Sequence, residues 1–246
     1  LERAWRGSYS KSYLDGIVAK FPECDGDYEL FIDGDAMEPA KYPNDGFMTV
    51  EKVHESCAPR HMTDAEIQTY KNKPANERAT MKINLSGDYN ERAKKWTNAK
   101  DMLMFGYFME DWADATVLVD TIDANTGTIR SKYPHTYGVK EGARVYVYIL
   151  LEEVDAPGEY YVDTVTNTLY IYPPKDITNS DIKMSVLKTP LIKLDKCKYI
   201  TFKNMDFSVS RTNIFNGDNC ENITVDGCEL SWTGDKAAYF SSGYKN

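Results

Sequence analysis

Two carboxylates near the end of the sequence have the type and spacing that glycosidic chemistry requires. Asp206 and Glu229 occupy the same position in two consecutive copies of an internal repeat. If each copy is one coil of stacked parallel strands, the two side chains lie one strand spacing apart, roughly 4.8 Å. A retaining glycosidase holds its two carboxyl groups about 5–5.5 Å apart, and their repulsion raises the pKa of one of them. We therefore predict Asp206 and Glu229 as a catalytic pair, with an ordinary solvated face as the alternative.

Aromatic side chains in the middle of the sequence are candidates for sugar binding, because flat rings stack on the faces of sugars. We predict that Trp96, Tyr107 and Trp112 form a carbohydrate-binding platform, to which Asp111 adds a polar edge. Burial of the tryptophans in the core is the competing expectation. Three scattered cations would suit acidic sugars, namely Arg6, Lys41 and Arg144.

The His, Cys and acidic residues do not have the spacing of a resident metal or cofactor site. The three His are scattered, and the five Cys include no CxxC pair and leave at least one thiol unpaired. Asp195 and Asp218 recur at one repeat position, where Ca²⁺ would need about six or more oxygens; capping of a turn is the alternative. Cys197 and Cys220 also recur, which suits either a disulfide or a ladder of small half-buried side chains, and Cys228 is expected in the core.

The repeat itself predicts the fold of the last part of the chain. Residues 195–210 match residues 218–233 at a constant shift of 23 in residue number, with Asp, Cys, Ile-Thr and Ser recurring in place. The apolar residues alternate, which indicates strands, and the alternation skips one step at Asn204 and Gly227, which tolerate a left-handed corner. A period in the twenties indicates a solenoid. Residues 186–246 are therefore predicted to form the first coils of a right-handed parallel β-helix, which we expect to continue because solenoids need about three or more repeats.

Residues 1–185 have the signals of an irregular, antiparallel, sandwich-like β portion. Short apolar runs separated by turn residues dominate it, so the fold class of the whole chain is all-β. A short helical insertion is expected around residues 63–103. Its first helix begins after Thr63, which forms a capping box with Glu66. A second helix is expected over residues 90–102.

Charge and hydropathy exclude several classes of partner. The 246-residue chain carries 29 basic and 38 acidic residues, for a formal net charge of -9. Nucleic acids and anionic membranes bind basic surfaces, so neither is expected as a partner. No stretch approaches the ~20 apolar residues of a membrane span, and no signal peptide opens the sequence. The oligomeric state stays open.

The order of motifs resembles the N-terminal part of bacterial right-handed β-helix proteins, close in pattern to glycoside hydrolase family 141 and its relatives. Four parts of the chain carry this resemblance: residues 4–6; residues 29–34 with 40–44; residues 105–113; and residues 151–163 with 169–173. The last of them, which contains Leu-Glu-Glu-Val-Asp-Ala-Pro-Gly-Glu, is the most specific. Lys41 stands where the family usually has Arg, and Tyr160 where it has Trp, which weakens the subfamily assignment more than the fold.

The resemblance implies a sandwich-like portion inserted around early coils, a polysaccharide or oligosaccharide as ligand, and an extracellular or cell-surface location. It supplies no catalytic residue, because in such enzymes the catalytic acids usually project from later coils. The first hypothesis is therefore the front of a secreted polysaccharide-degrading enzyme, inactive by itself. The alternatives are a non-catalytic carbohydrate-binding or adhesion module and a polysaccharide lyase, which would need a Lys or Arg base and usually Ca²⁺.

Overall fold

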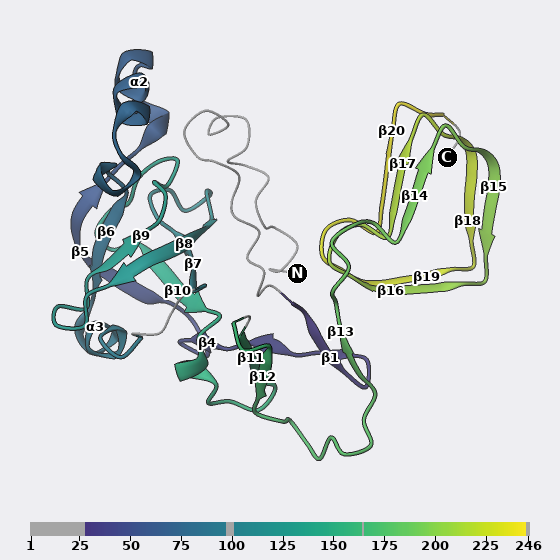
Figure 1. Cartoon of the computed structure of the whole chain (residues 1–246), viewed down its shortest axis with the longest axis horizontal. Coiled ribbons are helices and arrows are strands. Elements are labelled where there is room, and N and C mark those ends of the chain that lie inside the picture. The colour runs from purple at the N-terminus through teal and green to yellow at the C-terminus, as the bar shows by residue number, and fades with distance from the viewer. Residues whose placement is uncertain (1–27, 97–100, 164, 245–246) are drawn as a thin grey trace. The chain divides into compact units, whose positions relative to one another are not determined.

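The computed structural model describes residues 28–96, 101–163 and 165–244. These residues divide into two compact units, one formed by residues 38–175 and the other by residues 28–37 together with 176–244. The chain is mostly β, as the sequence predicts (Figure 1). Residues 4–6 of the resemblance, Arg6 and Cys24 lie outside the described residues.

The unit of residues 38–175 is built on a closed antiparallel barrel. Six strands pair in the ring order β10–β5–β6–β9–β8–β7, and β7 then pairs with β10 to close it. Their bounds are β5 Met48–Ser56, β6 Met81–Leu85, β7 Leu103–Tyr107, β8 Ala115–Ile122, β9 Ile129–Ser131 and β10 Arg144–Tyr148. The predicted sandwich-like arrangement is therefore wrong for this unit. A sandwich has edge strands that are unpaired on one side, whereas the pairing of β7 with β10 leaves no such edge in the barrel.

The barrel core follows from alternation along its strands. In β6 the side chains of Met81, Ile83 and Leu85 are buried, while Lys82 and Asn84 between them are half-buried. This is the period of two that a strand with one face on a core requires. Apolar side chains of the other barrel strands pack with them in the same core: Met48, Val50, Met104, Val117, Val119, Ile129, Val145 and Val147.

Short elements complete this unit. Helix α2 (Asp64–Asn72) begins with the predicted capping box between Thr63 and Glu66. Helix α3 (Gly87–Ala93) ends at Ala93, so the predicted helix over residues 90–102 is wrong in its extent. The remaining elements are η2 Pro59–His61, η3 Ala75–Glu77, η4 Leu151–Glu153, β4 Lys41–Tyr42, which pairs with β10, and the small sheet of β3 Glu38–Pro39, β11 Glu159–Asp163 and β12 Thr168–Ile171.

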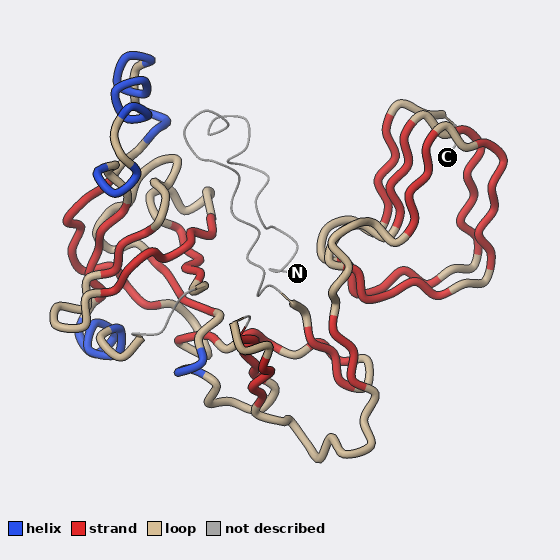
Figure 2. The backbone as a smooth tube through the Cα atoms, in the orientation of Figure 1, coloured by secondary structure: helices blue, strands red, loops and turns tan. Residues whose placement is uncertain are grey.

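The other unit contains stacked coils of parallel strands. Three parallel sheets form around each coil, and every strand pairs with its equivalent in the next copy of the repeat, as Ile192 with Phe215 and Phe215 with Ala238. Figure 2 shows these strands in red on three sides of the coils. Their bounds are β14 Ile192–Asp195, β17 Phe215–Asp218 and β20 Ala238–Ser241 on one side; β15 Lys198–Lys203 and β18 Glu221–Asp226 on the second; and β16 Asp206–Ser210 and β19 Glu229–Thr233 on the third.

The predicted corner of each coil is confirmed by the backbone. Asn204 has a φ of 54° and Gly227 a φ of 61°, so both adopt the left-handed conformation at the same place in consecutive coils. A small antiparallel sheet precedes the coils, in which β1 (Leu30–Ile32) pairs with both β2 (Asp35–Ala36) and β13 (Ile182–Met184). The predicted tight turn after Ile32 joins β1 to β2.

Candidate functional site

Trp112 is the most exposed tryptophan among the described residues, and it lies in the loop between β7 and β8. Its side chain is 71% exposed, and its ring centroid lies 5.5 Å from that of Tyr137 in an edge-to-face arrangement. Tyr137 in turn lies against buried His135 and beneath the guanidinium of Arg60. The indole is therefore supported from within the unit while much of its surface meets solvent, as stacking on a sugar ring requires.

Tyr107 lies beneath Arg144, which also pairs with Asp111 in the loop that carries Trp112. The Arg144 guanidinium carbon lies 4.8 Å from the centroid of the Tyr107 ring and 5.5 Å from that of Phe47. The same guanidinium donates through Nη2 to Asp111 Oδ1 over 3.3 Å, and Asp111 directly precedes Trp112. The structure thus joins Tyr107 and Asp111 through Arg144, while the ring of Trp112, the next residue after Asp111, packs on Tyr137.

Phe47 and Tyr137 belong to this arrangement although the sequence analysis did not select them. Phe47 packs edge-to-face on Tyr107, and Tyr137 does the same on Trp112. Neither lies at a strand or helix spacing from its partner, because the contacts bring together separate loops and strands. Only their type, aromatic residues in a β-rich chain, was visible in the sequence.

Trp96 does not belong to the platform. Its side chain is 1% exposed within the barrel core, and its indole Nε1–H donates to the carboxylate of Glu153. A sugar has no access to a ring in that position. The prediction of Trp96 as a carbohydrate-binding residue is therefore corrected, and the competing expectation of core burial describes it.

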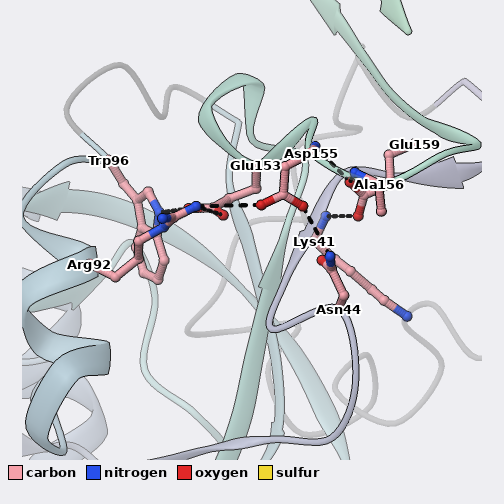
Figure 3. A network of polar contacts seen from close by, with 8 residues as sticks. All are labelled: Lys41, Asn44, Arg92, Trp96, Glu153, Asp155, Ala156 and Glu159. Carbon is pink, nitrogen blue, oxygen red and sulfur yellow. Dashed lines mark hydrogen bonds and ion pairs between the residues drawn. The ribbon is translucent and has the colours of Figure 1, made fainter. Parts of the chain in front are cut away.

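Glu153 forms a buried charged network (Figure 3). Its carboxylate is 0% exposed and accepts from Arg92 twice, at 2.9 Å from Nε and 2.8 Å from Nη2, in addition to the Trp96 indole. The hydrogen bonds from Arg92 to Glu153 raise the pKa of the arginine, so the guanidinium stays protonated. With its oxygens engaged by three N–H groups and shielded from solvent, Glu153 positions α3 against η4 rather than exchanging protons with a substrate.

The Asp-Ala-Pro-Gly-Glu segment is a turn held by its own acids. Glu159 is buried, and its Oε2 accepts from the backbone N–H groups of Asp155 at 3.0 Å and Ala156 at 2.8 Å. Asp155 accepts from the side-chain amide of Asn44 at 3.0 Å. The most specific motif of the resemblance therefore serves the architecture of this unit (Figure 3).

Asp206 and Glu229 are direct register partners on the parallel strands β16 and β19. Both are exposed, while the neighbouring Phe207 turns inward against Phe215 with ring centroids 5.0 Å apart. Neither carboxylate has a hydrogen-bond or ion-pair partner among the residues that the structure describes. The two acids are thus neighbours, but no buried wall or fixed donor of the kind that tunes a general acid accompanies them in this part of the chain.

Asp195 and Asp218 are also register partners, at the corner of the coil. Asp218 accepts from Ser241 Oγ at 2.9 Å and from the Asn219 side-chain amide at 3.1 Å. Within the described residues, no group of three or more His, Cys, Asp or Glu side chains is placed to hold a metal ion.

No disulfide joins any two of the four described cysteines. Cys197 and Cys220 form a ladder in which each Sγ lies 3.4 Å from the carbonyl oxygen two residues earlier. Of the two alternatives left open for this pair, the structure adopts the ladder of small side chains. Cys220 is buried and Cys228 is half-buried.

Comparison with known proteins gives a structural likeness. No protein-family model matches the chain, and no curated protein matches it significantly. Among solved structures, a chain described as a glycoside hydrolase matches 76% of this chain at 16% identity and a TM-score of 0.49. The match covers 32% of that glycoside hydrolase, so the present chain spans about a third of its length. No described helix is both long and apolar enough to cross a membrane.

Proposed function

We propose that this chain is the front part of a secreted polysaccharide-degrading protein of the glycoside hydrolase kind, built on a right-handed parallel β-helix. The constant parallel register between successive copies of the repeat supports the β-helix, because a fixed period makes each coil a template for the next. The sequence resemblance supports the polysaccharide as substrate. In this proposal the barrel unit holds the glycan, and coils beyond those described carry the chemistry.

The observation that carries the carbohydrate-binding role is the setting of Trp112. Tryptophan side chains are usually mostly buried, but the indole of Trp112 is 71% exposed. It packs on Tyr137, which holds it at the surface. Beside it, Asp111 and Arg144 supply an acceptor and several N–H donors for sugar hydroxyls. A ring for the apolar face of a sugar and polar groups for its edge form the combination that orients a pyranose.

A non-catalytic binding module is the second candidate, and the exposed setting of Asp206 and Glu229 favours it. The two carboxylates are register partners on neighbouring strands, but they lie open to solvent without the enclosure typical of a catalytic acid. Both candidates predict that this chain binds a glycan without cleaving it, so the experiment tests the binding role that they share and whether Asp206 and Glu229 are catalytic.

The test is a panel of polysaccharides measured in parallel for binding and for release of reducing sugar. We expect at least one polysaccharide to bind, and Trp112→Ala to weaken that binding about tenfold, equivalent to about 1.4 kcal/mol. Tyr199→Ala is the matched control, because Tyr199 is an equally exposed aromatic residue, 75% exposed, on the coils. It should leave the affinity unchanged.

The outcomes test the shared binding role and the location of catalysis. Binding without release agrees with a binding module or with an enzyme whose catalytic coils lie elsewhere. Release of sugar that Asp206→Asn and Glu229→Gln abolish would instead place catalysis on β16 and β19. Failure of every polysaccharide to bind, or equal loss from Trp112→Ala and Tyr199→Ala, would contradict the proposed role of the barrel.

A further inference from the structure

The loop that carries Trp112 is densely acidic. Glu110, Asp111 and Asp114 all lie within two positions of the indole, and all three side chains are exposed. Residues one or two positions apart have Cα atoms no more than about 7 Å from each other. The Cα atoms of all three acidic residues therefore lie within about one Debye length, ~8 Å at physiological ionic strength, of the Cα atom of Trp112.

Cations near the loop do not cancel this charge. Arg144 forms an ion pair with Asp111, with 3.3 Å between Nη2 and Oδ1, and its guanidinium lies over the rings of Tyr107 and Phe47. The side chains of Glu110 and Asp114 make no hydrogen bond or ion pair with any residue in the described parts of the chain. The formal net charge of the whole protein, -9, has the same sign.

We propose, on the basis of the carbohydrate-binding role assigned to Trp112, that this surface selects uncharged glycans and rejects polyanionic ones such as uronic acid polymers. A neutral sugar stacks on the indole and hydrogen-bonds to the Asp111–Arg144 pair, which presents both an acceptor and donors. A glycan that carries carboxylates meets Glu110 and Asp114 at close range, where like charges repel. Arg144 is already paired with Asp111 and does not reverse that repulsion.

The test compares derivatives that differ in charge alone. Each neutral polysaccharide that binds is carboxymethylated to introduce negative charge, or hydroxyethylated to the same degree as an uncharged control. We expect the hydroxyethyl derivative to bind within about threefold of the parent, and the carboxymethyl derivative at least tenfold more weakly at low salt. Because salt shortens the Debye length to about 3 Å at 1 M, the difference between the two derivatives should shrink there.

The double variant Glu110→Gln/Asp114→Asn tests whether the loop causes the selection. It removes two charges that neither stack on the sugar nor pair with Arg144, so neutral binding should persist while the penalty on the carboxymethyl derivative falls several-fold. Equal or tighter binding of the carboxymethyl derivative by the unmodified protein would overturn this inference and leave the carbohydrate-binding role intact. So would an unchanged penalty in the double variant. Binding of anionic polysaccharides alone would likewise overturn only this inference, whereas failure of every polysaccharide, neutral or charged, to bind would overturn both.

Discussion

At the scale of single residues, Glu153 shows how a charge is kept inside the barrel unit. Its carboxylate has no exposure, and a burial of this kind is tolerated only when each oxygen has partners. Arg92 supplies two N–H groups and Trp96 a third, while Arg92 itself is one-third exposed and also lies 3.6 Å from Asp155. The pair therefore connects the core to the surface turn at residues 155–159.

We predict that Glu153→Gln lowers the free energy of unfolding by about 3 kcal/mol, because it leaves Arg92 without its buried counter-charge. Urea denaturation followed by tryptophan fluorescence measures this loss. Glu91→Gln is the control with the same chemical change: Glu91 pairs with Lys94 at the surface, with a side chain 67% exposed, and should cost less than about 0.5 kcal/mol. Similar losses in the two variants would show that the network contributes no more than a surface pair.

His135 predicts a dependence of stability on pH. It is 5% exposed, and its Nδ1 lies 2.7 Å from the carbonyl oxygen of Gly138. Burial lowers the pKa of His135 below its ordinary value of 6.5. The unfolded chain therefore binds a proton at a pH where the folded protein does not, and stability is lost as the pH falls from about 6.5 toward the folded pKa.

The measurement is the unfolding free energy of the wild type and of His135→Gln between pH 7.5 and pH 5. Because carboxylates titrate in both proteins, the informative quantity is the difference in unfolding free energy between the wild type and His135→Gln at each pH. We expect the advantage of the wild type over the variant to shrink as the pH falls. Parallel profiles would mean that His135 is protonated equally readily in the folded and unfolded chain.

At the scale of elements, closure of the barrel depends on how closely β7 approaches β10. Gly106 pairs with Val145, and a Cβ atom at Gly106 would lie 2.6 Å from the carbonyl oxygen of Arg144 and 2.6 Å from Val145 Cγ1. No real Cβ contact is that short, so the two strands would have to separate. The absence of a side chain at Gly106 therefore allows β7 and β10 to pair.

We predict that Gly106→Ala destabilises the protein by about 2 kcal/mol through overpacking at this closure. Gly46→Ala is the comparison: Gly46 has a φ of 74° but open space around it, so it should cost only the left-handed backbone term of about 1 kcal/mol. Thermal unfolding followed by circular dichroism compares the loss of stability in the two variants. A smaller loss at Gly106 than at Gly46 would show that the strands separate easily.

The coils show a second rule for elements. Left-handed backbone recurs at matching positions of successive copies: at Lys196, Asn219 and Ser242, at Tyr199 and Asn222, at Asn204 and Gly227, and at Val209 and Trp232. Each corner therefore has the same geometry in each coil even where the residue type changes. Asn and Gly tolerate this conformation, which is why the corner at residues 204 and 227 was recognisable in the sequence, whereas Lys196 and Ser242 gave no such signal.

At the scale of the whole molecule, the barrel unit is an insertion. Strand β1 pairs with β13 although the whole barrel unit separates them in the sequence, and the Glu29 backbone N–H donates to Ser185 Oγ across 156 positions. Residues 38–175 depart from and return to this small sheet. The glycan-binding surface proposed around Trp112 thus belongs to a compact unit with its own core, distinct from the coils that carry Asp206 and Glu229.

Features whose partners lie at a constant offset or a few residues apart could be predicted from the sequence alone. The coil register, the left-handed corner at Asn204, the capping box at Thr63 and the neighbourhood of Asp206 and Glu229 are of this kind, because a repeat or a short motif encodes each contact. Closure of the barrel, burial of Trp96 and the contacts of Arg144 with Tyr107 and Asp111 emerged only when the chain was folded. Their partners are distant in the sequence, and no periodicity relates them. Whether an aromatic ring enters the core or stays at the surface depends on the strand that pairs beside it, which alternation within one segment does not specify.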